Sequence, residues 1–398
     1  MATIIFCTSP IGKAIPNYFF LLADALALQG HQMILITDQN RPDAFPPAKE
    51  NLKTLSWPSK RPTKLRDFLF FYRVCKKYKP DVTLGQFGST NIVLLVSKCM
   101  RVPIILNYWH TMFDQVRMDS TTSNFKRLLQ QKRKKIILHF CATYIFTNSY
   151  ENKKDLSRTF KISPDRIPVF HYLIPDNFRH SPLQEGKARE RKIVFVARLD
   201  KSKGHAQVLY EMPALLLRFP GLQLFIIGEG KERQRLENLC SQLKIENNVV
   251  FTGPLSLTEV YAHLATALIH VSASSQEAFG LVNAEALSAG TPILANKVGG
   301  IREILEDGVN GYFFNPEKQG DFVAKASALL TKNWPCFSQN ARHSFLQNFS
   351  ASEENIRQQV HAFHALLQNS PGEAVDNTAY RKGTGTLATN KLTANEKA

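Results

Sequence analysis

The chain has 398 residues, 44% of them apolar and 21% charged, which is typical of a globular protein long enough for two domains. No apolar run approaches the ~20 residues that a membrane span needs. The six cysteines lack a C-x-x-C pair, which is typical of reduced thiols in a cytoplasm. The net charge of +17 is concentrated in residues 1–190, where 29 Lys and Arg stand against 14 Asp and Glu. This asymmetry indicates that the first half meets an anionic surface, either a membrane or a nucleic acid.

The first half alternates apolar runs with helical patterns, which predicts a parallel sheet covered by helices. It opens with a strand at 3–7 rather than a signal peptide, then a turn with Gly12, a helix over 17–29 and a strand at 31–37. A single glycine beside Lys13 is a weak phosphate signal, and a simple turn is an equal alternative. Further strands are predicted at 82–84, 103–107 and 144–147.

His110 is a candidate site residue of this half. It follows directly on the strand at 103–107, at the carboxyl end where an open α/β sheet forms its ligand site. A lone histidine is more often structural, so both interpretations stay open on position alone.

Two basic segments of the first half, 60–79 and 125–140, mix Lys and Arg with Leu, Ile, Phe and Tyr. This composition is typical of helices that lie on an anionic membrane surface. The alternative is an ordinary solvated helix with its apolar side in the core. Nucleic acid is less favoured, because no helix-turn-helix, zinc ligand set or RNA-binding aromatic signature accompanies the charge.

A linker rich in Pro, Gly and charge is predicted around 176–191, and a new strand begins at 192–196. Arg198 at the end of that strand and Lys203 before a helix form a clamp of suitable size for a diphosphate. Gly228 and Gly253 follow the next two predicted strands, at 222–227 and 249–253.

The second half is organised around a strand-loop-helix unit that begins with the buried strand 267–271. The loop carries Glu277 and Gly280, and the helix carries Glu285 and ends at Gly290. Gly280 allows a ligand to approach the backbone, and a carboxylate at Glu285 within an apolar helix requires a partner such as a ribose diol. The alternative is that both are ordinary helix-start and surface carboxylates.

Together these motifs resemble the family 4 retaining glycosyltransferases. The resemblance depends on the order Arg198…Lys203-Gly204, Gly228-x-Gly230, Val250-Phe-x-Gly253, Glu277-x-Phe-Gly280…Glu285-Ala286…Gly290-Thr-Pro292 and Val298-Gly-Gly300. It implies the GT-B fold, an α/β architecture of two Rossmann-like domains facing across a cleft, with a C-terminal helix crossing back. The domains would be residues 1–180 on the acceptor side and 190–345 for the nucleotide-sugar, followed by a crossing helix at 350–368 and a disordered tail at 369–398.

The resemblance also implies roles for individual residues. Arg198 and Lys203 would bind the donor diphosphate, Glu285 the ribose and Glu277 the sugar hydroxyls, while His110 would meet the sugar from the other domain. Backbone groups from Phe279 through Gly280 to Leu281, and at Gly12 and Gly228, would approach sugar or phosphate, and Gly253 would lie near the base. The chain departs from the family at His171-Tyr172-Leu173, where members usually carry Asn-Gly-Val, and in having one glycine in the first loop.

The implied activity is transfer of a hexose from a UDP- or GDP-sugar to a lipid-linked or polysaccharide acceptor, as in lipopolysaccharide synthesis. The enzyme would act in the cytoplasm as a peripheral protein at the inner face of the membrane. It would need no cofactor and no metal, because the sequence has no D-x-D and two cations can stabilise the leaving group. Alternatives are a nucleotide-sugar epimerase, a soluble glucan synthase, or a non-catalytic basic protein that binds membrane or nucleic acid.

Overall fold

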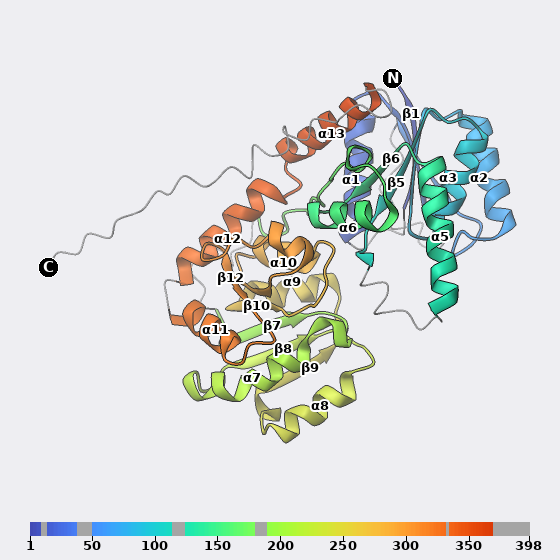
Figure 1. Ribbon diagram of the computed structural model, residues 1–398. Helices are drawn as coiled ribbons and strands as arrows, with labels where there is room; N and C mark the ends of the chain where they lie inside the picture. Colours follow the sequence, from blue (N-terminus) through green and yellow to red (C-terminus); the bar gives the residue numbers. More distant parts are fainter. Residues whose placement is uncertain (9–13, 38–49, 114–123, 180–188, 332–333, 369–398) are drawn as a thin grey trace.

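The computed structural model has two lobes, each built on one six-stranded parallel sheet (Figure 1). The chain forms the first lobe, crosses to the second, and returns to the first with its last helix. None of the helices described is long and apolar enough to cross a membrane. The residues described are 1–8, 14–37, 50–113, 124–179, 189–331 and 334–368.

The first sheet has the strand order β3-β2-β1-β4-β5-β6. All five residues of β4 are buried, because helices cover both faces of the sheet. The strands are β1 Thr3–Cys7, β2 Gln32–Thr37, β3 Leu52–Ser56, β4 Val82–Gln86, β5 Ile104–Trp109 and β6 Tyr144–Thr147. The helices are α1 Ala14–Leu28, α2 Leu65–Tyr78, α3 Thr90–Cys99, α5 Asn124–Cys141 and α6 Tyr150–Phe160, with short 3-10 turns η2 Phe87–Ser89 and η3 Pro164–Arg166.

The second sheet repeats this arrangement with the order β12-β11-β10-β7-β8-β9. Its strands are β7 Lys192–Val196, β8 Gln223–Ile227, β9 Val249–Gly253, β10 Ile269–Ser272, β11 Ile293–Asn296 and β12 Gly311–Phe314. Its helices are α7 His205–Arg218, α8 Arg233–Gln242, α9 Leu257–Thr266, α10 Leu281–Ser288, α11 Asp321–Thr331 and α12 Trp334–Asn348, with 3-10 turns η5 Lys201–Lys203, η6 Glu246–Asn248 and η7 Gly299–Glu303.

The last helix, α13 (Glu353–Gln368), packs against α1 and so returns the chain to the first lobe (Figure 1). Tyr18 of α1 donates a hydrogen bond from its hydroxyl to Gln359 at 2.9 Å. Phe363 lies edge-on to Phe6 of β1 with ring centroids 6.0 Å apart. The expected helix that crosses back to the first lobe is confirmed.

The predicted α/β class and the two parallel sheets are confirmed, but the sequence did not predict β3, β11 and β12. In the edge strand β3 only Leu52 is buried, so its residues carry no clear apolar signal. The strands β11 and β12 have four residues each, which is too short for a pattern to stand out. Gly12, most of the predicted linker and the predicted tail at 369–398 lie outside the residues that the structure describes.

Candidate functional site

The two sheets present the carboxyl ends of their strands at a reversal of strand order. In the first sheet the chain builds β1, β2 and β3 outward and then returns to the other side of β1 as β4. In the second sheet β10 likewise returns to lie beside β7. Open α/β sheets bind ligands outside such reversal points. In the second sheet Arg198 follows β7 and Glu277 follows β10. In the first sheet Gln86 is the last residue of β4, and His110 follows β5.

Lys203 and Glu277 form a largely buried ion pair in the second lobe. The Lys203 ammonium donates to a carboxylate oxygen of Glu277 at 2.8 Å, and the two side chains are only 10% and 20% exposed. Gly204 makes this contact possible. Its φ is +77°, and a Cβ there would lie 2.2 Å from the carbonyl oxygen of Ala273. The loop after β7 therefore packs directly on the end of β10.

Arg198 has a different environment. Its guanidinium donates to Asp200 at 2.7 Å, and its side chain is 58% exposed. The predicted clamp of Arg198 and Lys203 is therefore not closed in this state, since each cation lies against a carboxylate of its own. An exposed Arg can exchange that carboxylate for phosphate at little cost.

Two glycines of the predicted site shape the loop backbone beside Arg198. A Cβ on Gly228 would lie 2.1 Å from the carbonyl oxygen of Ala197, and one on Gly230 would lie 2.4 Å from that of Leu199. Gly253 has a φ of +74° and accepts a hydrogen bond from the Gly228 amide at 2.9 Å. The absence of side chains at these positions lets the loops after β7, β8 and β9 lie against one another.

The loop that carries Glu277 is held by tight turns on both sides. Gly280 has a φ of +92° and precedes α10. The Gly300 amide donates to the carbonyl of Glu277 at 3.0 Å, and a Cβ on Gly299 would lie 1.7 Å from that oxygen. Phe279 is buried against Tyr172 of the first lobe with ring centroids 5.4 Å apart, whereas Leu281 is half-buried.

Glu285 is a buried carboxylate of α10 with an exposed fraction of 4%. Tyr261 of α9 shares a hydrogen bond with it. Burial raises the pKa of Glu285 from 4.5 to about 7. The side chain therefore changes charge near neutral pH and is a strong acceptor for hydroxyl groups when ionised.

His110 is enclosed by aromatic rings. It stacks on Phe87 at 4.0 Å and on Tyr108 at 4.6 Å between ring centroids, and Nδ1 is hydrogen-bonded to the Tyr172 hydroxyl. Burial lowers the pKa of His110 to about 3, so the ring is neutral at physiological pH. Its Nε2 is buried and has no hydrogen-bond partner in the part of the chain that the structure describes.

Two more buried polar side chains at the same edge of the first sheet lack partners among the described residues, and the sequence alone did not identify them. Gln86 ends β4 and is 2% exposed, and within the described ranges neither its amide oxygen nor its amide nitrogen has a hydrogen-bond partner. Thr8 follows β1, and its hydroxyl has no partner in the same part of the chain. Buried polar atoms are rarely left unsatisfied, so this cluster is a candidate position for a hydroxylated ligand. No local sequence spacing links the two residues.

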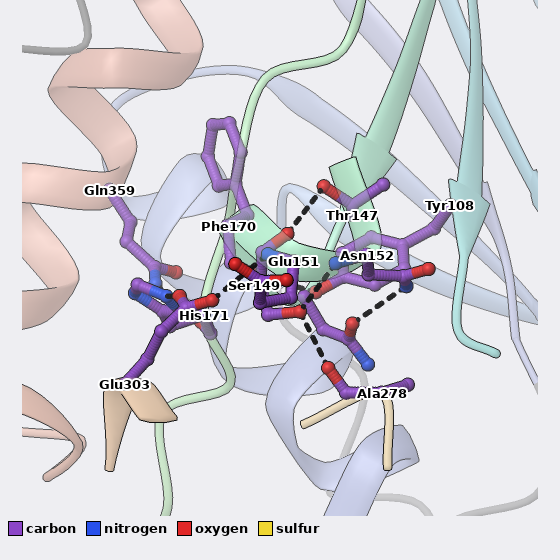
Figure 2. A network of polar contacts seen from close by, with 11 residues as sticks. Tyr108, Thr147, Ser149, Glu151, Asn152, Phe170, His171, Ala278, Glu303 and Gln359 are labelled. Atoms are coloured by element: carbon purple, nitrogen blue, oxygen red, sulfur yellow. Dashed lines mark hydrogen bonds and ion pairs between the residues drawn. The ribbon is translucent and has the colours of Figure 1, made fainter. Parts of the chain in front are cut away.

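Contacts between the lobes form a network around the start of α6 (Figure 2). The Ser149 hydroxyl donates to the carbonyl of Ala278 at 2.5 Å, which fastens the Glu277 loop to the first lobe. Glu303 of η7 accepts from the amide of Glu151 at 3.1 Å and from His171 at 2.8 Å. Nothing in the sequence linked these residues of the two lobes.

The described residues contain no group of three His, Cys, Asp or Glu side chains placed to hold a metal ion. The positive charge of the site comes from Arg198 and Lys203, which suits an anionic ligand such as a diphosphate.

Two family profiles match successive parts of the chain. Residues 15–176 match "Glycosyltransferase Family 4" and residues 178–349 match "Glycosyl transferases group 1".

The chain is 31% identical over 215 residues to an uncharacterized glycosyltransferase of Methanocaldococcus jannaschii, covering 50% of this chain and 54% of that protein. It is 22% identical over 379 residues to the alpha-monoglucosyldiacylglycerol synthase of Streptococcus pneumoniae, covering 88% and 82% of the two chains. The matched region spans about half the length, or less, of several of the curated relatives.

Solved structures show the same fold at low identity. The sucrose-phosphate synthase of Thermosynechococcus elongatus superposes with a TM-score of 0.73 at 18% identity, covering 93% of this chain and all of that one. The Anabaena protein Alr3699/HepE, solved in complex with UDP-glucose, gives a TM-score of 0.70 at 16% identity over 92% of this chain and all of that one.

Proposed function

The chain belongs to the family 4, group 1 glycosyltransferases of GT-B fold, and on that premise we propose that it transfers a sugar from a nucleotide-sugar with retention of configuration and without a metal. The observation that carries the proposal is the pairing of Lys203 with Glu277 at the β7/β10 reversal point. The loop that carries Glu277 is fastened to the first lobe through Ala278 and Ser149, and that lobe has buried polar atoms at the carboxyl ends of its strands that lack partners among the described residues. The cations Arg198 and Lys203 of the second lobe suit the diphosphate of a nucleotide-sugar, and the polar atoms of the first lobe suit the hydroxyl groups of its sugar. These are the cationic half and the hydroxyl-binding half of the site.

The second lobe would hold the nucleotide diphosphate. Phosphate oxygens would take the place of Glu277 on Lys203 and of Asp200 on Arg198, and the two cations would stabilise the charge that develops on the leaving phosphate. Glu277, released from Lys203, would accept hydrogen bonds from the sugar. Glu285 would bind the ribose hydroxyls in exchange for Tyr261.

The transfer breaks the bond between the sugar C1 and the phosphate oxygen and forms a bond between C1 and the acceptor hydroxyl oxygen. Attack on the face from which the nucleotide leaves retains the configuration. The acceptor proton would pass to the departing phosphate oxygen. His110 is neutral and hydrogen-bonded at Nδ1, so it would orient the sugar rather than remove this proton.

The acceptor side would be a membrane. The helices α2 and α5 flank α3 on one side of the first sheet and expose large apolar side chains among their Lys and Arg residues. This exposed basic surface carries Leu65, Leu69 and Tyr72 on α2, and Leu128, Leu129, Ile136 and Phe140 on α5. An anionic bilayer would attract the Lys and Arg side chains through its headgroups and bury the apolar side chains at its interface. The name of the Streptococcus relative, a glucosyldiacylglycerol synthase, favours a lipid-linked acceptor and a peripheral position at the inner face of the membrane.

The test is to incubate the protein with a panel of UDP- and GDP-sugars, with and without anionic vesicles that contain lipid acceptors, and to measure free nucleotide and sugar-linked product. The proposal predicts that one donor releases nucleotide and that the acceptor accelerates the release. An isomerised nucleotide-sugar without release would show an epimerase, and growth of a soluble glucan would show a glucan synthase. If the protein neither turns over nor binds a nucleotide-sugar, the remaining alternative is a non-catalytic protein that binds membrane or nucleic acid.

A further inference from the structure

Tyr172 of the first lobe occupies the place where the sequence departs from the Asn-Gly-Val segment of its family, and it contacts His110. Its hydroxyl and His110 Nδ1 are hydrogen-bonded, and the two rings lie parallel to within 6°. Tyr172 is 1% exposed. A hydrogen bond between a hydroxyl and an imidazole can run in either direction, so the other partners of these groups decide which atom carries the proton.

The orientation of two side-chain amides bears on this direction. Asn152 donates from its amide nitrogen to the carbonyl of Trp109 at 3.2 Å and to the amide oxygen of Asn148 at 2.9 Å. Asn148 in turn donates to the carbonyl of His110 at 3.2 Å. Main-chain carbonyls only accept, so the orientation of both amides is fixed.

The same amide nitrogen of Asn148 lies 3.4 Å from the Tyr172 hydroxyl and therefore donates to it. The hydroxyl oxygen is an acceptor in that bond, and its own proton has two acceptors within reach, His110 Nδ1 and the hydroxyl of Tyr108, which itself donates to the carbonyl of Phe170. An imidazole nitrogen is the stronger acceptor of the two, which favours donation from Tyr172 to His110 Nδ1. A neutral imidazole that accepts at Nδ1 carries its proton on Nε2. Among the described residues, this buried Nε2 has no hydrogen-bond partner.

We propose that Tyr172 is a positioning residue that holds His110 as the neutral Nε2–H tautomer, so that His110 serves the sugar as a hydrogen-bond donor and not as a base. The inference rests on the proposed function in that the sugar hydroxyl is the acceptor that Nε2–H lacks. A buried donor without an acceptor is costly, and binding of a hydroxylated ligand removes that cost.

The surroundings of His110 maintain this state over a wide pH range. The rings that face it are Phe19, Phe87, Tyr108 and Tyr172. None of these rings is charged, and the remaining contact, Asn148, is a neutral amide. Burial raises the pKa of the Tyr172 hydroxyl, so it keeps the proton that it donates.

The residue before Tyr172 lies at the contact between the lobes. His171 pairs with Glu303 of the second lobe at 2.8 Å, and its carbonyl accepts from Gln359 of α13 at 2.7 Å (Figure 2). The segment that carries Tyr172 is thus held, through its neighbour, by the second lobe and by the crossing helix.

The first part of the test needs no substrate. In the protein labelled with 15N in its histidine rings, the His110 signals are identified by their loss in His110→Gln. They should show a proton on Nε2, none on Nδ1, and no titration between about pH 5.5 and 8. In Tyr172→Phe the Nδ1 signal should shift. The control Tyr18→Phe removes a buried tyrosine hydroxyl from the same aromatic cluster without touching His110, and it should leave the signals in place. A proton on Nδ1 of the wild-type ring overturns the proposal.

The second part is a double-mutant cycle on kcat/KM. Tyr172→Phe should lower kcat/KM about tenfold, the worth of about one hydrogen bond. His110→Gln, which retains an N–H donor, should keep more activity than His110→Ala, and adding Tyr172→Phe to it should cause no further loss. Additive losses would mean that Tyr172 acts independently of His110 and would overturn the proposal. If the wild-type protein consumes no nucleotide-sugar, the proposed function fails, and the NMR result still decides the role of Tyr172.

Discussion

The two lobes differ in whether the polar groups of the candidate site have hydrogen-bond or ion-pair partners. In the second lobe each charged group of the site has a partner, since Lys203 pairs with Glu277 and Arg198 with Asp200. In the first lobe several buried polar atoms have no hydrogen-bond partner among the described residues, and they include both ends of the Gln86 amide and Nε2 of His110.

The difference indicates where the favourable free energy of ligand binding would come from in each lobe. Phosphate must compete with carboxylates in the second lobe, so binding there exchanges one ion pair for another. Hydroxyl groups in the first lobe meet atoms that have no alternative partner, so binding there removes a cost that folding left in place. Substitutions in the two lobes should therefore have different effects on stability and on activity.

Arg198→Ala should have the largest effect on activity. We expect a loss of about 10²–10³ in kcat, because the guanidinium stabilises charge that develops on the leaving phosphate. The folded state should be unaffected, since the side chain is 58% exposed. Steady-state transfer assays and thermal melts measure the two effects, with Arg235→Ala on the surface of α8 as the control. Near-normal turnover in Arg198→Ala would remove this residue from the site.

Glu285→Gln should lower activity and raise stability at high pH. The pKa of Glu285 in the fold is about 7 against an ordinary 4.5, so the stability that its proton supplies is fully present below pH 4.5 and lost as the pH rises through 7. At 1.36 kcal/mol per pKa unit the loss is on the order of 3 kcal/mol by pH 8. Glutamine is neutral at every pH, so the Glu285→Gln variant does not lose this stability as the pH rises.

Urea unfolding at about pH 5 and pH 8 tests this prediction. The advantage of Glu285→Gln should grow with pH, whereas the exposed control Glu317→Gln should show none. A difference that does not change with pH would mean that Glu285 is not a buried carboxylate of shifted pKa.

The exposed basic surface should bind anionic vesicles. Replacing Lys132, Arg133 and Lys135 of α5 by Gln should weaken binding by up to ~3 kcal/mol, at ~1 kcal/mol per charge. Higher salt should also weaken it, because the screening length falls from ~10 Å at 0.1 M to ~3 Å at 1 M. Vesicle flotation measures the change. The matched control replaces Lys231, Lys244 and Lys318, all exposed in the second lobe. Equal losses in both triple variants would indicate a nonspecific charge effect.

Gln86→Met should raise the free energy of unfolding by about 1 kcal/mol, since it removes two unsatisfied polar atoms at similar volume. Transfer should fall several-fold if these atoms bind substrate. Gln359 is the matched control, because it is also buried but donates to His171 and accepts from Tyr18. Gln359→Met should therefore destabilise the protein. Destabilisation by Gln86→Met would show that its amide is satisfied in solution.

Chelation should have the smallest effect. Because Arg198 and Lys203 supply the positive charge at the diphosphate, EDTA should leave the rate unchanged within error. The assay compares untreated protein, protein with EDTA, and EDTA followed by excess Mn²⁺. Activity that disappears with EDTA and returns with Mn²⁺ would refute the assignment.

The sequence predicted the relative positions of the candidate residues better in the second lobe than in the first, for a physical reason. Glu277, Gly280 and Glu285 lie on one continuous strand-loop-helix unit, so their spacing in the chain is also their arrangement in space. Gln86 and His110 come from the ends of different strands, and only the sheet brings them together. Contacts such as that of Ser149 with Ala278 join residues far apart in the chain, and no local pattern predicts them.

The most direct test of this account is to measure, by calorimetry, the affinity of the free nucleoside diphosphate and of its nucleotide-sugar for two variants. Lys203→Ala should weaken both ligands, because both carry the diphosphate. His110→Ala should weaken the nucleotide-sugar and leave the nucleoside diphosphate unchanged. If His110→Ala weakens both ligands equally, or if Lys203→Ala weakens neither, then the division of the site into a cationic half and a hydroxyl-binding half is wrong.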